Sequence, residues 1–174
     1  MRINGKNILV FPEYHLTDFP PQAPLTMQEA YELLMAYEKH GFDVLISGYV
    51  ERENNNNFSS CIVIDDGKTH NIRKVRPYKD EVKFISPSTD KKNTIDLSIG
   101  KSLFVICHEF SFLLKGEYQD IIAQSDIDNL ILISAMFHKF EENTKTCLNY
   151  CKEHKIKRFV TSDRFFGLNV TEVT

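Results

Sequence analysis

Three side chains that could react together stand beside short apolar segments of the chain. Cys107 ends the apolar run 103–106, and Glu13 follows the apolar run 8–11. Lys74 lies between them in a basic stretch. A thiol attacks as its thiolate, a carboxylate can take the thiol proton, and an ammonium group can hold a developing oxyanion. These residue types point to a nucleophilic site, provided that the fold brings them together.

The elements that must position these residues alternate between strands and helices. Strands are predicted at residues 7–11, 43–50, 58–64, 69–75, 95–99, 103–106, 130–135 and 158–162. Helices are predicted at residues 26–39, 116–125 and 141–154, with loops at 17–24 and 86–93. A capping box of Thr26 and Glu29 begins the first helix, and Gly41 ends it. Residues 65–68 form a hairpin turn, so the strands beside it are antiparallel. This pattern predicts an α/β layered domain with a mixed sheet.

Composition restricts the classes of function. The 174 residues suit a single domain over residues 1–174, with 42% hydrophobic and 26% charged residues. A net charge of −3 does not favour nucleic-acid binding, and no run of apolar residues is long enough for a membrane span. The start of the chain lacks the apolar region of a signal peptide, and the four cysteines form no Cys-x-x-Cys pair. These features favour the cytoplasm, whose reducing conditions keep a reactive thiol reduced.

Other common site chemistries find little support in the sequence. The six histidines form no i, i+4 pair and no tight spacing with cysteine, so no metal site is predicted. The seven glycines form no phosphate-binding loop. We therefore expect no cofactor.

Three segments, taken in order, resemble the nitrilase superfamily, the carbon–nitrogen hydrolases. They are Phe11-Pro12-Glu13, Arg73-Lys74 and Ile106-Cys107-His108-Glu109. The segments 129–135 and 158–163 also resemble strands of that family, so the resemblance extends from about residue 7 to about residue 167. It implies an α-β-β-α sandwich with mixed sheets, shortened at both ends. Family members have a further strand and helix before the glutamate segment and further strands after the last one.

The resemblance implies a role for each reactive residue. Cys107 would be the nucleophile and Glu13 the general base. Lys74, with the backbone N–H of His108, would hold the oxyanion. Glu81, seven residues after Lys74, matches loosely a second glutamate that positions the lysine and substrate. A turn after the strand would expose the sulfur, and the N-terminus of a following helix would lower its pKa.

Residues near these positions are candidates for bracing the site or binding the substrate. Glu109 is expected to brace the site by hydrogen bonding. Tyr14, His108 and Phe137 are candidate substrate-binding residues on the loops around the pocket. His15 could also line the pocket. His108 is a poor base for Cys107, because adjacent residues on a tight turn point apart.

Each assignment has a purely structural alternative. Cys107 could be a small core residue, and Glu13 could face water at a strand end. The basic residues around Lys74 could form a solvated strand face, because alternation groups Lys74 with Arg76 and does not single it out. Glu81 could be a surface acid.

Three functions remain open on these observations. The first is a thiol hydrolase that cleaves a non-peptide C–N bond of a small amide, or a nitrile, through a thioester-type intermediate. The second is a catalytically inactive nitrilase-like module for binding or assembly. The third is an unrelated α/β domain in which Cys107 senses redox state. Family members pair through helices beside the nucleophile strand, so a homodimer is expected.

Overall fold

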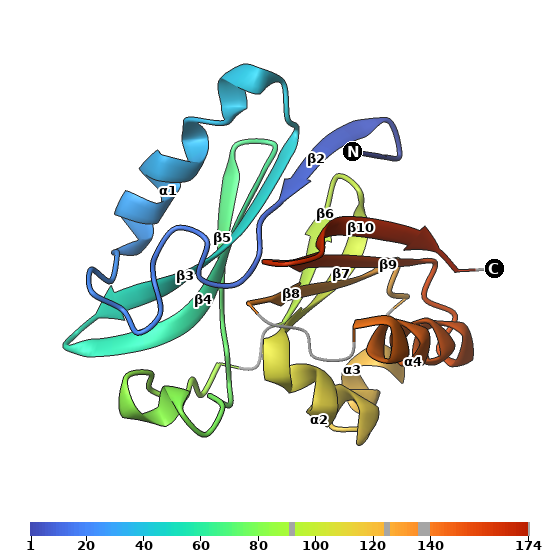
Figure 1. Cartoon of the computed structure of the whole chain (residues 1–174). Coiled ribbons are helices and arrows are strands. Elements are labelled where there is room, and N and C mark those ends of the chain that lie inside the picture. The colour runs from blue at the N-terminus through green and yellow to red at the C-terminus, as the bar shows by residue number, and fades with distance from the viewer. Residues whose placement is uncertain (91–92, 124–125, 136–139, 174) are drawn as a thin grey trace.

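The computed structural model consists of two five-stranded sheets stacked between helices (Figure 1). It describes residues 1–90, 93–123, 126–135 and 140–173. Helix α1 lies against the outer face of one sheet, and α2, α3 and α4 lie against the outer face of the other. The expected α-β-β-α sandwich with mixed sheets is therefore confirmed.

The first sheet has the strand order β1-β2-β3-β4-β5. Its strands are β1 (Arg2–Ile3), β2 (Lys6–Val10), β3 (Val44–Glu53), β4 (Asn56–Asp65) and β5 (Lys68–Arg73). The β2–β3 pair is parallel, and the other pairs are antiparallel. Helix α1 (Met27–Met35) begins with the predicted capping box of Thr26 and Glu29. It is followed by the short helices η1 (Glu38–His40) and, further on, η2 (Glu81–Lys83).

The second sheet has the order β10-β9-β8-β7-β6. Its strands are β6 (Thr94–Leu97), β7 (Gly100–Ile106), β8 (Asn129–Ser134), β9 (Arg158–Asp163) and β10 (Gly167–Glu172). The three central strands are parallel, and each edge strand is antiparallel to its neighbour. Its helices are η3 (Cys107–Glu109), α2 (Phe110–Leu114), α3 (Gln119–Ala123) and α4 (Phe140–Glu153).

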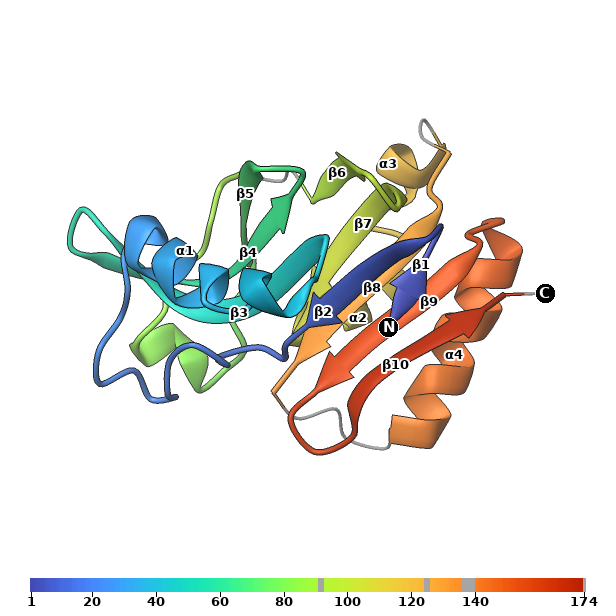
Figure 2. The same ribbon diagram turned by 90° about the horizontal axis from the view of Figure 1, so that it is seen from above.

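Alternation along the strands builds three apolar layers. On β7, Phe104 and Ile106 face the first sheet, while Leu103 and Val105 face the helices. Ile8 and Val10 of β2 belong to the layer between the sheets, and Figure 2 shows β1 and β2 lying over the strands of the second sheet. The third layer, which includes Leu34, fills the space between α1 and the first sheet.

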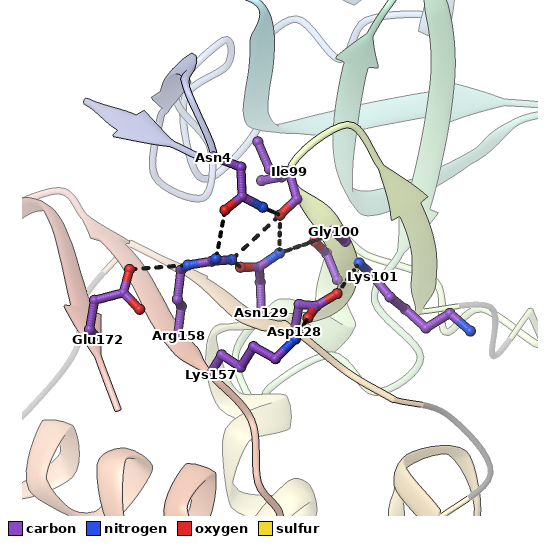
Figure 3. Close-up of polar contacts among 10 residues, drawn as sticks. Asn4, Ile99, Gly100, Lys101, Asp128, Asn129, Lys157, Arg158 and Glu172 are labelled. Atoms are coloured by element: carbon purple, nitrogen blue, oxygen red, sulfur yellow. Dashed lines mark hydrogen bonds and ion pairs between the residues drawn. The ribbon is translucent and has the colours of Figure 1, made fainter. Parts of the chain in front are cut away.

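A polar cluster joins the two sheets around Arg158 (Figure 3). The Arg158 guanidinium donates to Oδ1 of Asn129 at 2.8 Å, to Oδ1 of Asn4 at 2.9 Å and to Oε1 of Glu172 at 3.1 Å. The Asn4 amide in turn donates to the carbonyl of Ile99 at 3.0 Å. Asn4 follows β1 in the first sheet, whereas Arg158 begins β9 in the second. These contacts therefore connect the sheets directly.

Several element boundaries differ from the sequence expectation. The first helix ends at Met35 instead of residue 39, and Gly41 terminates the short helix η1 with a left-handed backbone (φ 79°). The strand expected at 95–99 ends at Leu97, and the strand expected at 69–75 ends at Arg73. The helix expected at 116–125 is present as α3 over Gln119–Ala123. Helix α2 and strands β1 and β10 were not predicted. Among the described residues, no helix is long and apolar enough to cross a membrane.

Candidate active site

A pocket of about 550 Å³ opens where loops leave the carboxyl ends of β2, β5, β7 and β8. Residues from the loops and helices that follow strands of both sheets line it: Glu13, Tyr14, Phe19, Tyr78, Asp80, Glu81, Cys107, His108, Phe110, Ser111, Leu114, Ala135 and Asn143. Strand ends that meet at one edge bring together residues far apart in sequence. The fold thus gathers Glu13, Glu81 and Cys107 into one cavity.

Cys107 occupies the turn that directly follows β7. Its backbone is left-handed (φ 50°), a conformation that costs free energy for a residue other than glycine. Cys107 is half-buried and lines the pocket, and Ser134 Oγ lies 3.5 Å from Sγ. Cys107 is therefore a half-buried turn residue at the pocket and not a fully buried core residue.

The Cys107 thiol is protonated at rest. Burial, followed by the charge of Glu13, raises its pKa to about 12, although Lys74 and Ser134 act to lower it. This overturns the expectation of a lowered pKa. The helices that follow Cys107 are short, and their N-termini do not outweigh desolvation and the neighbouring carboxylate.

Glu13 is buried, with one carboxylate oxygen bonded and the other unbonded. Oε1 accepts hydrogen bonds from Lys74 Nζ at 3.0 Å and from Ser59 Oγ at 2.9 Å. Oε2 has no hydrogen-bond partner among the described residues. The negative charge of Glu13 is near enough to the Cys107 thiol to raise the pKa of that thiol. A buried carboxylate oxygen without a donor is ready to accept a proton.

Gly48 on β3 makes this position of Glu13 sterically feasible. A Cβ atom at Gly48 would lie 2.5 Å from Cα of Glu13 and 2.8 Å from the carbonyl oxygen of Pro12. Both neighbours are backbone atoms, so they have little freedom to yield. Sequence reasoning missed Gly48, although a glycine inside a buried strand is a general signal of close backbone approach.

Lys74 lies fully buried between two carboxylates, just past the end of β5. Its Nζ donates to Oε1 of Glu13 at 3.0 Å and to both oxygens of Glu81 at 2.8 Å. Burial acts to lower the Lys74 pKa, but Glu13, Cys107 and Glu81 outweigh it and raise the pKa. The neighbouring Arg76 is exposed. The alternative of a solvated face that includes Lys74 is therefore wrong.

Glu81 is part of this buried cluster and not a surface acid. Its carboxylate accepts hydrogen bonds from the Tyr14 hydroxyl at 2.7 Å and from the Tyr78 backbone N–H, in addition to those from Lys74. Burial tends to raise its pKa, but Lys74 and these donors lower it overall. Tyr14 holds a left-handed backbone (φ 59°), and its hydroxyl points to Glu81.

Glu109 ties the lysine segment to the cysteine segment. Its carboxylate accepts hydrogen bonds from the backbone N–H of Val75 at 2.7 Å and of Ile106 at 3.3 Å. Val75 follows Lys74, and Ile106 precedes Cys107. Burial raises the Glu109 pKa to about 7. The expected bracing by hydrogen bonds is confirmed.

The remaining candidates divide into those at the pocket and those elsewhere. Tyr14 and His108 line it. Phe137 lies outside the described residues. His15 is exposed and stacks on Phe11 with ring centroids 3.8 Å apart, and it is not one of the lining residues.

Ser59 and Ser134 were missed, because a serine on a strand gives no signal of what it will face. No group of histidine, cysteine, aspartate and glutamate among the described residues could hold a metal ion.

No protein-family profile matches the sequence, and no curated protein matches it. Solved structures do match. Nit3 of Saccharomyces cerevisiae, a member of the nitrilase superfamily, superposes with a TM-score of 0.70 at 19% identity, covering 91% of this chain and 62% of that one. XC1258 of Xanthomonas campestris, a CN-hydrolase superfamily protein, superposes with a TM-score of 0.74 at 11% identity, covering 98% and 72%.

An amidase of the nitrilase superfamily from Nesterenkonia superposes with a TM-score of 0.71 at 12% identity, covering 90% of this chain and 63% of the amidase. At these identities the likeness establishes the fold. The chain therefore has the fold of the nitrilase superfamily. It spans 62% of the length of Nit3 and 63% of that of the amidase.

Proposed function

We propose that the protein is a cysteine-dependent hydrolase that cleaves a non-peptide C–N bond in a small amide, or hydrolyses a nitrile. The observation that supports this most is the unpaired Oε2 of Glu13, buried at the same pocket as the Cys107 thiol. A base with a vacant acceptor beside a protonated nucleophile is what acyl transfer to sulfur requires. The fold shared with an amidase of the nitrilase superfamily agrees with this assignment.

In the first half of the proposed reaction, Glu13 takes the proton of Cys107 as Sγ attacks the amide carbon. The carbonyl oxygen becomes an oxyanion, which Lys74 Nζ and the backbone N–H of His108 would hold. Nζ already contacts three carboxylate oxygens, so it would exchange one of its two contacts with Glu81 for the oxyanion. The C–N bond then breaks, the leaving nitrogen takes the proton from Glu13, and the acyl group remains as a thioester. A nitrile would form a thioimidate at the same sulfur.

In the second half, water replaces the departed amine. Glu13 takes a proton from this water as its oxygen attacks the thioester carbon. The C–S bond breaks, the carboxylic acid leaves, and the proton returns to sulfur. A thiol pKa of about 12 fits such a cycle, because the thiolate would form only as the attack takes place.

Ammonia release tests this function directly. Wild type is incubated with a panel of primary amides and nitriles, and compared with Cys107→Ala and with Cys151→Ala, which removes a buried thiol in the helix layer. We expect turnover in wild type and Cys151→Ala, and none in Cys107→Ala. A mass increase equal to the acyl group, located on Cys107 after rapid acid quench, would identify the thioester. Turnover that survives in Cys107→Ala would contradict the proposal.

The alternative of an inactive binding or assembly module has one observation in its favour. The chain covers less than two thirds of the length of Nit3. This alternative predicts no turnover by wild type on any member of the panel. A redox sensor is less favoured, because sensing needs a thiol with a low pKa.

We further propose a single-domain protein that works as a homodimer in the cytoplasm. All four cysteines are free, which suits a reducing compartment. Light scattering on the purified protein would test the dimer, and a mass of one chain at micromolar concentration would exclude it.

A further inference from the structure

The pocket wall beside Glu13 is built from aromatic rings. Tyr14 and Phe19 stack with their ring centroids 4.8 Å apart and their planes 18° from parallel. Phe84 meets the edge of this stack, with a centroid distance of 5.9 Å to Phe19. Phe19 is half-buried and lines the pocket, so part of its ring surface remains open to a ligand.

Apolar side chains also form the wall near the nucleophile. Phe110, Leu114 and Ala135 line the same cavity as Cys107. A volume of about 550 Å³ far exceeds what the smallest amides would occupy. The cavity therefore has room for a side group, and apolar surface to cover it.

The charges around this cavity are unfavourable for an anion. Three of the described lining residues carry carboxyl groups, and none of them is a lysine or arginine: the three are Glu13, Asp80 and Glu81. The positive charge of Lys74 is already shared between two of these carboxylates. Burial, followed by the charge of Lys74, lowers the pKa of His108, which keeps that imidazole neutral at pH 7. A carboxylate on the substrate would meet these carboxyl groups with no lysine or arginine among the described lining residues to pair with.

We infer that the substrate is an amide whose acyl group carries an uncharged apolar side group, and that Phe19 is a specificity-determining residue that packs against it. This inference rests on the proposed function and narrows it to one class of acyl group. Burial of an apolar group against the aromatic wall would favour binding, because both apolar surfaces leave water. A charged group would lose its hydration at the same place, which would oppose binding.

A matched series of amides tests this inference. Propionamide, 3-phenylpropionamide, succinamate and β-alaninamide share one carbon chain and differ in the end group: hydrogen, a ring, a carboxylate or an ammonium. We expect kcat/KM for 3-phenylpropionamide to exceed that for propionamide about tenfold or more, from burial of the ring. Succinamate should fall below propionamide, because the lining carboxyl groups oppose its charge. β-Alaninamide should fall below 3-phenylpropionamide, because its ammonium would lose hydration against the aromatic wall. A preference for succinamate or β-alaninamide, or equal rates across the series, would overturn the inference while leaving the proposed hydrolase intact.

Variants of Phe19 locate the preference. Phe19→Ala should reduce the ratio between 3-phenylpropionamide and propionamide to about threefold or less, because it removes the ring surface that the side group covers. Phe19→Leu should keep part of the ratio. Leu33→Ala, at an exposed position on α1, should leave the ratio unchanged. An unaltered ratio in Phe19→Ala would overturn the role of Phe19.

A second readout does not depend on turnover. Each amide is tested for protection of Cys107 against alkylation by iodoacetamide, which reports occupancy of the pocket. Protection that is strongest for 3-phenylpropionamide, and weaker for succinamate than for propionamide, supports the inference even if no amide is hydrolysed, in which case the proposed function alone fails. Equal protection, or protection by the charged amides alone, contradicts the inference.

Discussion

The Lys74 ammonium nitrogen lies 3.0 Å from Oε1 of Glu13, and both side chains are buried. This pairing occupies one carboxylate oxygen and leaves Oε2 unbonded at the pocket. The ion pair therefore fixes the orientation of Glu13 without using up its capacity to accept a proton.

Replacing Glu13 with glutamine should separate its effect on the thiol from its role in the reaction. Turnover should fall about 10²- to 10⁴-fold, because the base is lost. The Cys107 pKa should fall below its wild-type value of about 12, because the Glu13 charge contributes to raising it. At pH 8 the thiolate fraction, and with it the rate of iodoacetamide alkylation at Cys107, should therefore rise.

Mass spectrometry of the alkylated peptide over pH 7 to 9.5 measures this change. Glu32→Gln, at an exposed position on α1, is the control and should match wild type in both readouts. Slower alkylation of Cys107 in Glu13→Gln would mean that the carboxylate does not raise the thiol pKa.

Replacing Lys74 with methionine should destabilise the fold in a pH-dependent way. Removing one partner from a buried ion pair costs about 3–5 kcal/mol of unfolding free energy, because a buried carboxylate loses its compensation. Lys74 lowers the pKa of Glu81, so in wild type this stabilisation is present at neutral pH and is lost as the pH falls. In the variant, protonation of Glu81 at low pH relieves the unpaired charge.

The difference in stability between wild type and Lys74→Met should therefore be larger at pH 7.5 than at pH 4.5. Urea unfolding at the two pH values measures it. Lys68→Met, at an exposed position on β5, should cost little at either pH. A pH-independent loss in Lys74→Met would indicate that packing, and not charge, makes up the cost.

Replacing Gly48 with alanine should displace the backbone that carries Glu13. The added Cβ would lie 2.5 Å from Cα of Glu13, so β3 and this loop would have to separate. We expect a stability loss of about 1–3 kcal/mol, typical of overpacking, and a larger proportional loss of turnover. Arg52→Ala, at an exposed position on the same strand, is the control. Turnover equal to wild type in Gly48→Ala would show that Glu13 tolerates the shift.

The sequence predicted those parts of the fold that depend on short-range patterns. The apolar runs before Glu13 and Cys107 form β2 and β7, and the turn at residues 65–68 joins an antiparallel pair. Strand β10 alternates apolar Leu168 and Val170 with polar residues, but two apolar residues at a sheet edge are too short a pattern to predict a strand. Helix α2 was missed because its sequence, Phe-Ser-Phe-Leu-Leu, is too short to show a helical period.

The site was predictable in its residue types and not in its electrostatics. The positions of Glu13, Lys74 and Cys107 followed from their motifs. Strand alternation alone could not distinguish Lys74 from Arg76, because burial of Lys74 depends on Glu81 reaching back to it. The raised pKa of Cys107 results from its burial and from the charge of Glu13, and both depend on the tertiary structure.

Replacing Glu109 with glutamine should change how stability varies with pH. Burial raises the Glu109 pKa from 4.5 to about 7, so the folded protein holds this proton more tightly than the unfolded chain. The folded state therefore loses up to about 3 kcal/mol as the pH rises through this window. The glutamine variant lacks this contribution, so its stability should decline less between pH 5 and pH 7 than that of wild type.

Denaturant titrations at pH 5, 6 and 7 give the comparison. Glu153→Gln, exposed at the end of α4, should follow the wild-type curve. Parallel curves for wild type and Glu109→Gln would show that Glu109 does not titrate in this range.

The bond from Arg158 to Asn4 spans 154 positions of the chain, whereas Glu13, Lys74, Glu81 and Cys107 all fall within a much shorter stretch. Closing so long a loop costs conformational entropy before it yields any contact, and folds rich in such distant pairs form slowly. On the ribosome, Asn4 emerges early and has to wait for β9. The pocket residues are therefore all synthesised before the hydrogen bond between Arg158 and Asn4, which connects the two sheets, can form.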